Sequence, residues 1–212
     1  MYILNDSIDF PNVSAANEDG LLAIGGDLSI SRLLNAYYNG IFPWYDEDQP
    51  ILWFSPDPRM VLFPEDLKTS KSMKQLIRKN CFEITFNKDF KQVIDNCATI
   101  DRPEQLGTWI TSDMQKAYIE LHEIGYAISA EVWQNERLVG GLYGIWLEEK
   151  KVFCGESMFT KVSNASKYGF IKLIELLRGK GVRLIDCQVY TDHLASLGAK
   201  EISRDAFMEF LR

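Results

Sequence analysis

The chain has 212 residues, of which 46% are hydrophobic and 25% charged, and this composition excludes intrinsic disorder as its main state. With 23 basic and 30 acidic side chains the net charge is -7, which argues against sequence-independent wrapping of nucleic acid. The four cysteines and two histidines show no paired spacing typical of a metal site, and no stretch approaches the ~18 apolar residues of a membrane span. We therefore expect a cytoplasmic protein with reduced thiols that uses no metal, no cofactor and no membrane contact.

Glycine and proline punctuate the first sixty residues, which indicates short elements joined by turns. One helix is predicted there, with a serine at position 29 or 31 as its cap, leucines and tyrosines at helical spacing, and Gly40 at its end. The segment at residues 63–66, Phe-Pro-Glu-Asp, then offers a linker. We expect a small N-terminal domain over residues 1–62 and a larger domain over residues 63–212.

Hydrophobic periodicity predicts alternating helices and strands beyond this boundary. The expected helices cover residues 69–79, 88–97, 112–125, 164–178 and 205–211, with a helical turn at 193–197. The expected strands cover residues 82–86, 126–134, 137–146, 151–158 and 184–189. Polar turns join the three consecutive strands, which should form an antiparallel meander, and a loop that contains Pro103 precedes Trp109. Ser112 and Asn164 are expected to cap the helices that they begin.

Two polar residues interrupt the otherwise apolar strand predicted at 184–189. Asp186 and Gln188 are two positions apart, so they point to one face of the sheet while Ile185 and Cys187 point to the other. A carboxylate in a β-rich core is costly to bury unless it is hydrogen-bonded. The two residues either form part of a site or simply satisfy each other and cap a neighbouring helix.

Another acid, Glu156, lies near the end of the third meander strand. Regular alternation would set Cys154, Glu156 and Met158 on one face, which places an acid next to a soft apolar wall. Gly155 permits a bulge or a close backbone approach. Pairing with the strand at 184–189 would bring this acid into one cleft with the carboxylate–amide pair; the alternative is a surface glutamate at a strand end.

A stripe of basic residues stands out in this acidic protein. It consists of Lys68, Lys71, Lys74, Arg78 and Lys79, and we refer to these five residues as the basic stripe. The first four are 3, 3 and 4 residues apart, so a helix would carry them on one face. Such a stripe can hold a few phosphates of a nucleic acid, and it can equally be a solvated helix face.

Several aromatic residues occupy loop-like segments, namely Phe42, Trp44, Tyr45, Trp53, Phe54 and Trp109. Aromatic rings are more often part of a core, but rings on loops also stack on nucleic-acid bases, at about 1–3 kcal/mol per base. His122 and His193 are interpreted as structural. No serine nucleophile motif and no glycine-rich phosphate loop accompanies these residues.

Nine segments, spread over nearly the whole chain, carry a family resemblance. They are GLLAIGGDL at 20–28, GIFPW at 40–44, PILWFSPDPR at 50–59, TWI at 108–110, LVGGLYG at 138–144, FCGESMF at 153–159, NASK at 164–167, LIDCQ at 184–188 and SLGA at 196–199. In this order they resemble the leucyl/phenylalanyl-tRNA–protein transferases of the bacterial N-end rule. The family implies an α+β fold, with a small N-terminal α/β domain and a larger domain that resembles the N-acetyltransferase fold, a mixed sheet flanked by helices.

The resemblance implies a reaction and its partners. The family moves Leu or Phe from aminoacyl-tRNA onto proteins that begin with Arg or Lys, which marks them for degradation; whether Met is also a donor stays open. An aminoacyl ester is already activated, and an α-amino group has a pKa of about 7.7–8.0, so the reaction requires neither a strong base nor a metal. The site must instead supply positioning, an acceptor for the attacking amine and support for the oxyanion.

The resemblance also implies roles for single residues. Gln188 would accept a hydrogen bond from the amine while Asp186 orients it, and Glu156 would hold the donor's amino group or its terminal ribose. The aminoacyl group and the terminal adenosine would contact Trp53, Trp109, Phe153, Ser157, Met158 and Ile185. The basic stripe would contact the tRNA.

Three positions depart from the family pattern, and two other functions remain as alternatives. Ile128 and Lys68 stand where the family commonly has His, and Lys71 stands where Arg is common; Lys keeps the charge but loses the bidentate fork of Arg. An acetyl-CoA-dependent N-acetyltransferase would suit a similar fold, but its pyrophosphate loop is missing. A non-catalytic recogniser of protein N-termini would use Asp186 and Glu156 as an acidic pocket.

Overall fold

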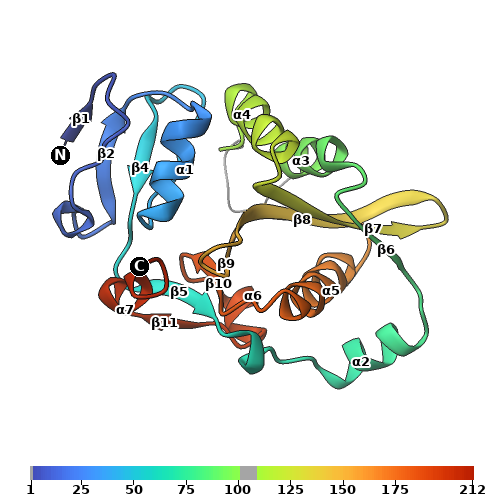
Figure 1. Cartoon of the computed structure of the whole chain (residues 1–212). Coiled ribbons are helices and arrows are strands. Elements are labelled where there is room, and N and C mark those ends of the chain that lie inside the picture. The colour runs from blue at the N-terminus through green and yellow to red at the C-terminus, as the bar shows by residue number, and fades with distance from the viewer. Residues whose placement is uncertain (1, 101–108) are drawn as a thin grey trace.

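Two β-sheets form the framework of the computed structural model, which describes residues 2–100 and 109–212 (Figure 1). The smaller sheet has the strand order β1-β2-β4-β3, and the larger has the order β11-β5-β10-β9-β8-β7-β6. In the larger sheet β9 and β10 run parallel and all other neighbours run antiparallel. The predicted α+β class with a mixed sheet flanked by helices is therefore confirmed. The predicted Pro103 loop and Thr108 of the TWI segment lie outside the described residues.

The elements have the following bounds. The smaller sheet contains β1 (Tyr2–Leu4), β2 (Leu21–Gly25), β3 (Phe42–Pro43) and β4 (Leu52–Phe54). The larger sheet contains β5 (Arg59–Leu62), β6 (Glu83–Phe86), β7 (Ala127–Gln134), β8 (Arg137–Leu147), β9 (Val152–Thr160), β10 (Leu184–Gln188) and β11 (Lys200–Ile202). The α-helices are α1 (Ile30–Tyr38), α2 (Lys71–Arg78), α3 (Phe90–Thr99), α4 (Ser112–Glu123), α5 (Ala165–Gly179), α6 (Asp192–Ser196) and α7 (Arg204–Met208). Short 3-10 helices are η1 (Val13–Ala15) and η2 (Pro64–Asp66).

The predicted helices and the antiparallel meander, now β7-β8-β9, are confirmed, and their ends shift by a few residues. Ser29 caps α1, because its side chain accepts a hydrogen bond from the main-chain N–H three residues on. The other two caps differ from the prediction. Thr111, and not Ser112, caps α4, while Asn164 precedes α5 with a φ of 69° and makes no side-chain cap bond.

The larger sheet begins earlier in the chain than the boundary expected after residue 62. β5 pairs antiparallel with both β10 and β11, so residues 59–62 belong to the larger sheet. The chain therefore passes from one sheet to the other between Phe54 and Arg59. The sequence pattern does not predict β5 or β11, because strands of 4 and 3 residues are too short to show an alternation.

Helices cover both faces of the larger sheet (Figure 1). α3 and α4 pack on one face against β7, with α1 beside α4, and α5 packs on the other face against β7 and β8. The described residues form three hydrophobic clusters, two of which border the site. Tyr143 and Cys154 belong to the cluster on the α4 side, and Phe153 and Ile185 belong to one on the α5 side. Within the described ranges, no helix has both the length and the apolar character needed to cross a membrane.

β9 and β10 are neighbours over only three residues. Val152–Cys154 pairs with Leu184–Asp186, and the parallel pairing ends there. β9 continues alongside β8 to its end, whereas β10 ends two residues later. This pairing shows that the two strands are adjacent, as the shared cleft of Glu156 and Gln188 requires. Beyond it the strands separate, which opens a gap between them in the middle of the sheet.

A bulge in each strand follows the last paired residue. The register shift in β9 leaves Glu156 as the extra residue, and the shift in β10 leaves Cys187 as the extra residue. The expected placement of Cys154, Glu156 and Met158 on one face is therefore wrong, because one extra residue reverses the alternation. Cys154 packs into the cluster on the α4 side, and Met158 packs against the cluster on the α5 side.

The bulge in β9 requires a residue without a side chain at position 144 of β8. A Cβ added to Gly144 would lie 2.2 Å from the carbonyl oxygen of Cys154, whereas a Cβ added to Gly179 at the end of α5 meets nothing within 4 Å. We expect Gly144→Ala to lower the free energy of unfolding by about 1–3 kcal/mol. Gly179→Ala, the matched control, should raise it by about 0.5–1 kcal/mol. Urea unfolding of both variants measures this, and equal stabilities would contradict the close approach at the bulge.

Candidate active site

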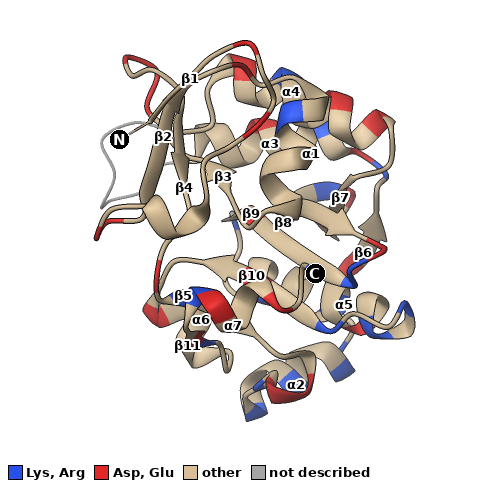
Figure 2. Ribbon diagram, turned by 60° about the vertical axis from the view of Figure 1, so that its left-hand side comes forward, with Lys and Arg blue, Asp and Glu red and all other residues tan. Residues whose placement is uncertain are grey.

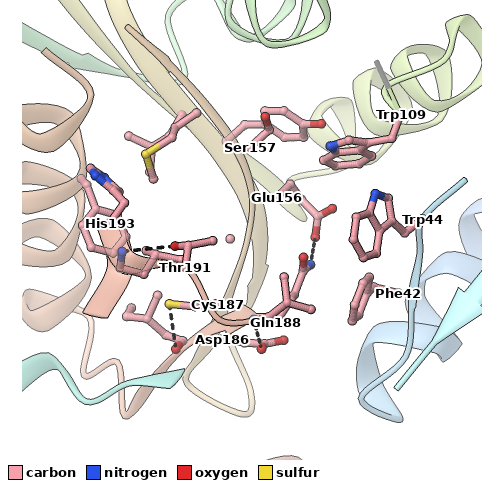
Figure 3. Close-up of a pocket in the computed structure, with 18 of the residues that line it drawn as sticks. Phe42, Trp44, Trp109, Glu156, Ser157, Asp186, Cys187, Gln188, Thr191 and His193 are labelled. Carbon is pink, nitrogen blue, oxygen red and sulfur yellow. Dashed lines mark hydrogen bonds between the residues drawn. The ribbon is translucent and has the colours of Figure 1, made fainter. Parts of the chain in front are cut away.

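A cavity of about 340 Å³ lies where β9 and β10 separate (Figure 3). Each strand contributes the residues that follow its last paired position, Gly155–Met158 from β9 and Cys187–Val189 from the end of β10. Phe42–Trp44 from the smaller sheet, Trp109 ahead of α4, Phe170 from α5 and Leu194 from α6 complete much of the wall. The cavity is thus formed by segments that are far apart in the sequence.

Glu156 and Gln188 meet at this cavity through their side chains (Figure 3). The Gln188 side-chain amide donates from Nε2 to Glu156 Oε1 at 3.1 Å, and the Tyr118 hydroxyl donates to Glu156 Oε2 at 3.1 Å. The hydroxyl of Tyr37, from α1, in turn bonds the hydroxyl of Tyr118. Because Glu156 binds the nitrogen of the Gln188 amide, the amide oxygen is the atom left to accept a hydrogen bond from a substrate.

The surroundings of Glu156 change its acidity. Burial raises the pKa of Glu156 from 4.5 to about 7, against the opposing effect of the hydrogen bonds from Tyr37 and Tyr118. Burial also raises the pKa of both tyrosines well above the usual value of 10.0, so they remain hydroxyl donors. Glu156 is therefore a carboxyl group that can gain or lose its charge near neutral pH.

Asp186 is held by an arginine of the neighbouring strand. Arg59 of β5 donates from Nε to Oδ1 at 2.8 Å and from Nη2 to Oδ2 at 2.7 Å, and both side chains are at most 2% exposed. Oδ1 also accepts the main-chain N–H of Gln188 at 3.0 Å. Asp186 thus contacts Gln188 through the backbone, which the spacing of the two residues does not indicate.

The structure brings together four of the six residues predicted for the aminoacyl group and the adenosine. Trp109, Ser157, Met158 and Ile185 line the cavity. Ile185 does so although strand alternation would separate it from Asp186, because the cavity wraps around the end of β10.

Trp53 and Phe153 are placed elsewhere, which corrects their assignment. Trp53 lies on β4 with no exposed surface, donates from its indole nitrogen to the Gly25 carbonyl at 2.9 Å, and packs edge-on against Phe10. Phe153 is 1% exposed and belongs to the core on the α5 side. The sequence around an aromatic residue next to a loop does not show whether its side chain faces a cavity or the core.

Sequence reasoning misses other residues of the site. Phe42 and Trp44, whose role the sequence leaves open, line the cavity, and Trp44 is 39% exposed. His193, interpreted as structural, also lines it on the side opposite Trp44 (Figure 3), and its buried Nε2 has no hydrogen-bond partner among the described residues. Burial, and then the charge of Lys167, lowers the pKa of His193. Across residues 2–100 and 109–212, no three His, Cys, Asp or Glu side chains gather as metal ligands would.

The basic stripe lies along and beside α2 (Figure 2). All five of its residues are exposed. None of its five residues forms a salt bridge with a described acid. Lys68 precedes the helix, and its main-chain N–H donates to the carbonyl of Leu197, just after α6. Because Leu194 of α6 lines the cavity, this contact connects the start of the stripe to the cavity wall.

Comparison with known proteins gives a consistent result over the whole chain. Residues 61–212 match the family described as leucyl/phenylalanyl-tRNA protein transferase, and residues 26–57 match the N-terminal domain of that family. Proteins named leucyl/phenylalanyl-tRNA–protein transferase from Christiangramia forsetii and Flavobacterium psychrophilum are 59% and 56% identical, with 100% of each chain covered. One from Pseudomonas fluorescens is 53% identical over 99% of this chain and 92% of its own.

A solved structure is similar at a much lower level. A GCN5-related N-acetyltransferase-like protein from Streptococcus suis is 11% identical, with a TM-score of 0.41, and the match covers 85% of this chain and 67% of that one.

The raised pKa of Glu156 predicts a dependence of stability on pH. Between pH 4.5 and about 7 the folded protein retains a proton that the unfolded chain has lost, so the contribution of this group to the free energy of unfolding falls as pH rises through that range. We expect Glu156→Gln, which stays uncharged, to gain stability relative to the unmodified protein between about pH 5 and about pH 8. Urea unfolding at both pH values measures the difference.

Glu120→Gln, at an exposed position of α4, is the matched control for this experiment and should show no comparable change with pH. The same stability difference between Glu156→Gln and the unmodified protein at both pH values would contradict the raised pKa.

Proposed function

The chain belongs to the leucyl/phenylalanyl-tRNA protein transferase family, which makes it an aminoacyltransferase, and we propose that it moves Leu or Phe from aminoacyl-tRNA to proteins that begin with Arg or Lys. This transfer would mark the acceptor proteins for N-end rule degradation. We place the enzyme in the cytoplasm; none of its four cysteines, all within the described residues, is part of a disulfide, which fits a reducing compartment. The observation that carries the proposal is the Glu156–Gln188 hydrogen bond at the gap between β9 and β10.

The reaction needs positioning more than activation. The α-amine of the acceptor attacks the carbonyl carbon of the aminoacyl ester, a C–N bond forms, and the C–O bond to the terminal ribose breaks. The proton lost by the amine ends on the ribose hydroxyl. Because Glu156 holds Nε2 of Gln188, the amide oxygen of Gln188 can accept a hydrogen bond from the acceptor amine. This hydrogen bond directs the lone pair of the amine nitrogen at the carbonyl carbon of the ester.

Glu156 supports this arrangement in two ways. Its two oxygens receive the Gln188 amide and the Tyr118 hydroxyl, which fixes the rotamer of Gln188. When it is ionised, its charge also favours the cationic groups that the two substrates bring, namely the donor's amino group and the acceptor's basic N-terminus. Because the pKa of Glu156 is about 7, binding of a positively charged substrate shifts this carboxyl group towards its ionised form near neutral pH.

The remaining wall suits the aminoacyl group and the end of the tRNA. Met158, Phe170 and Ile185 form an apolar surface that can bury a Leu or Phe side chain, and burial of such a side chain stabilises binding by about 1.5–3 kcal/mol. Trp44 and Trp109 lie on one side of the cavity (Figure 3), where their rings can stack on the terminal adenine. The basic stripe would hold phosphates of the tRNA body.

Transfer itself provides the first test. We expect label from charged Leu or Phe tRNA on peptides that begin with Arg or Lys, none on peptides that begin with Ala, and none after RNase treatment. Gln188→Ala should lower kcat on the order of 10²-fold with little change in KM, because the variant loses positioning and keeps the binding surface.

Gln134→Ala, at the end of β7 and away from the cavity, is the control and should transfer at the normal rate. Binding of the Arg peptide without any transfer would point to a non-catalytic recogniser of protein N-termini instead. A normal rate in Gln188→Ala would remove this residue from the mechanism.

The basic stripe generates a separate prediction. A variant with both Lys71→Ala and Lys74→Ala should bind aminoacyl-tRNA more weakly, and the slope of log affinity against log salt should fall by about one for each phosphate that the variant no longer neutralises. The control is Lys91→Ala with Lys116→Ala, because these exposed lysines on α3 and α4 form ion pairs with Asp95 and Asp113. Equal salt slopes in the two double variants would contradict the role of the stripe.

A further inference from the structure

We infer that Arg59 is a positioning residue for aminoacyl transfer, which sets the conformation of Gln188 through Asp186 and makes that conformation depend on the segment Gly40–Phe42. The inference rests on the proposed function, because it specifies what orients the amide that receives the acceptor amine. Arg59 does not line the cavity, so it acts only through other residues.

Arg59 joins three parts of the chain at one buried point. Two of its nitrogens bind the two oxygens of Asp186 on β10, and Nη1 donates to the carbonyl of Gly40 at 3.2 Å. The guanidinium lies over the rings of Phe42 and Phe207, with centroid distances of 4.8 and 4.6 Å. Planar, bidentate and stacked contacts of this kind are available to arginine and not to lysine.

The ion pair with Arg59 determines what Asp186 can do. An arginine side chain stays protonated in proteins, and its planar guanidinium matches the two oxygens of a carboxylate in a bidentate pair. The charge of Asp186 is thus matched by Arg59, and its Oδ1 also accepts the main-chain N–H of Gln188. Asp186 therefore fixes the backbone of Gln188, while Arg59 binds both of its carboxylate oxygens.

Gln188 needs this support because its backbone conformation is unfavourable. Its φ is 65°, in the left-handed region that residues with a side chain rarely occupy. A three-residue turn, in which the Val189 N–H donates to the Cys187 carbonyl at 2.8 Å, accompanies that conformation. Such backbone conformations persist only where the surrounding structure holds them, and here the surrounding structure is Asp186 with Arg59 behind it.

The contact with Gly40–Phe42 links this conformation to the opposite wall of the cavity. Phe42 lines the cavity, and it also lies against the guanidinium of Arg59. The same segment therefore contributes to the wall beside the donor and, through Arg59, to the orientation of the amide that receives the acceptor.

Arg59→Lys tests the inference, because it keeps the charge and removes the fork. We expect kcat for transfer to fall roughly 10- to 100-fold, with KM for the tRNA and for the Arg peptide within about threefold of normal. The decisive readout is the same substitution in a Gln188→Ala background. If Arg59 acts through Gln188, Arg59→Lys has no further effect on kcat there, whereas general damage to the fold would lower kcat by the same factor in both backgrounds.

Arg204→Lys is the matched control. Arg204 of α7 also reaches across to the N-terminal part of the chain, donating from Nη1 to the Ser55 carbonyl at 2.7 Å, but it forms no bond with Asp186. It should transfer normally. Circular dichroism shows whether Arg59→Lys folds. If it does not, Phe207→Leu takes its place, because it removes one of the two rings that stack on Arg59. We expect this variant to lower kcat about threefold or more, again only when Gln188 is present.

The outcomes separate the inference from the proposed function. No transfer by the unmodified protein would contradict the proposed function. Two outcomes would overturn the inference alone, provided that the unmodified protein and Arg204→Lys transfer normally. One is a normal kcat in the Arg59 or Phe207 variant, and the other is an equal loss of kcat in both backgrounds.

Discussion

The end of pairing between β9 and β10 is the constraint on which the site depends. Parallel neighbours that remain hydrogen-bonded leave no space for a ligand, but these two strands pair over three residues and then separate. Each continues with a bulge, which re-aims the side chains beside it. A carboxylate from one strand and an amide from the other therefore meet at the gap, where their backbones are no longer partners.

The two acidic residues beside the gap have different partners, and this difference assigns them different roles. Asp186 pairs with the guanidinium of Arg59, and it also accepts the main-chain N–H of Gln188, which shapes the backbone at the end of β10. Glu156 receives hydrogen bonds from an amide and a hydroxyl, and burial raises its pKa to about 7. One acid thus stabilises the geometry of the site, while the other can respond to the charge of a substrate.

Local sequence patterns predict the helices, the meander and the placement of Asp186 beside Gln188, because those features depend on residues within a few positions of each other. They do not predict the partners that complete the site, because Tyr118 lies 38 residues from Glu156 and Arg59 lies 127 residues from Asp186. Alternation also fails at the bulges, where one extra residue reverses the faces of all that follow, as Met158 shows. For Trp53, only the packing of β4 decides that an aromatic residue belongs to the core.

The most direct measurement of the central claim is a structure of the enzyme with a stable, amide-linked phenylalanyl-adenosine and a peptide that begins with Arg. The account predicts the phenylalanine ring against Met158, Phe170 and Ile185, and the peptide α-amine within hydrogen-bond distance of the Gln188 side-chain oxygen. It also predicts that the Glu156–Gln188 bond persists. A complex in which the ring lies outside this cavity, or in which the amine contacts neither Gln188 nor Glu156, would contradict it.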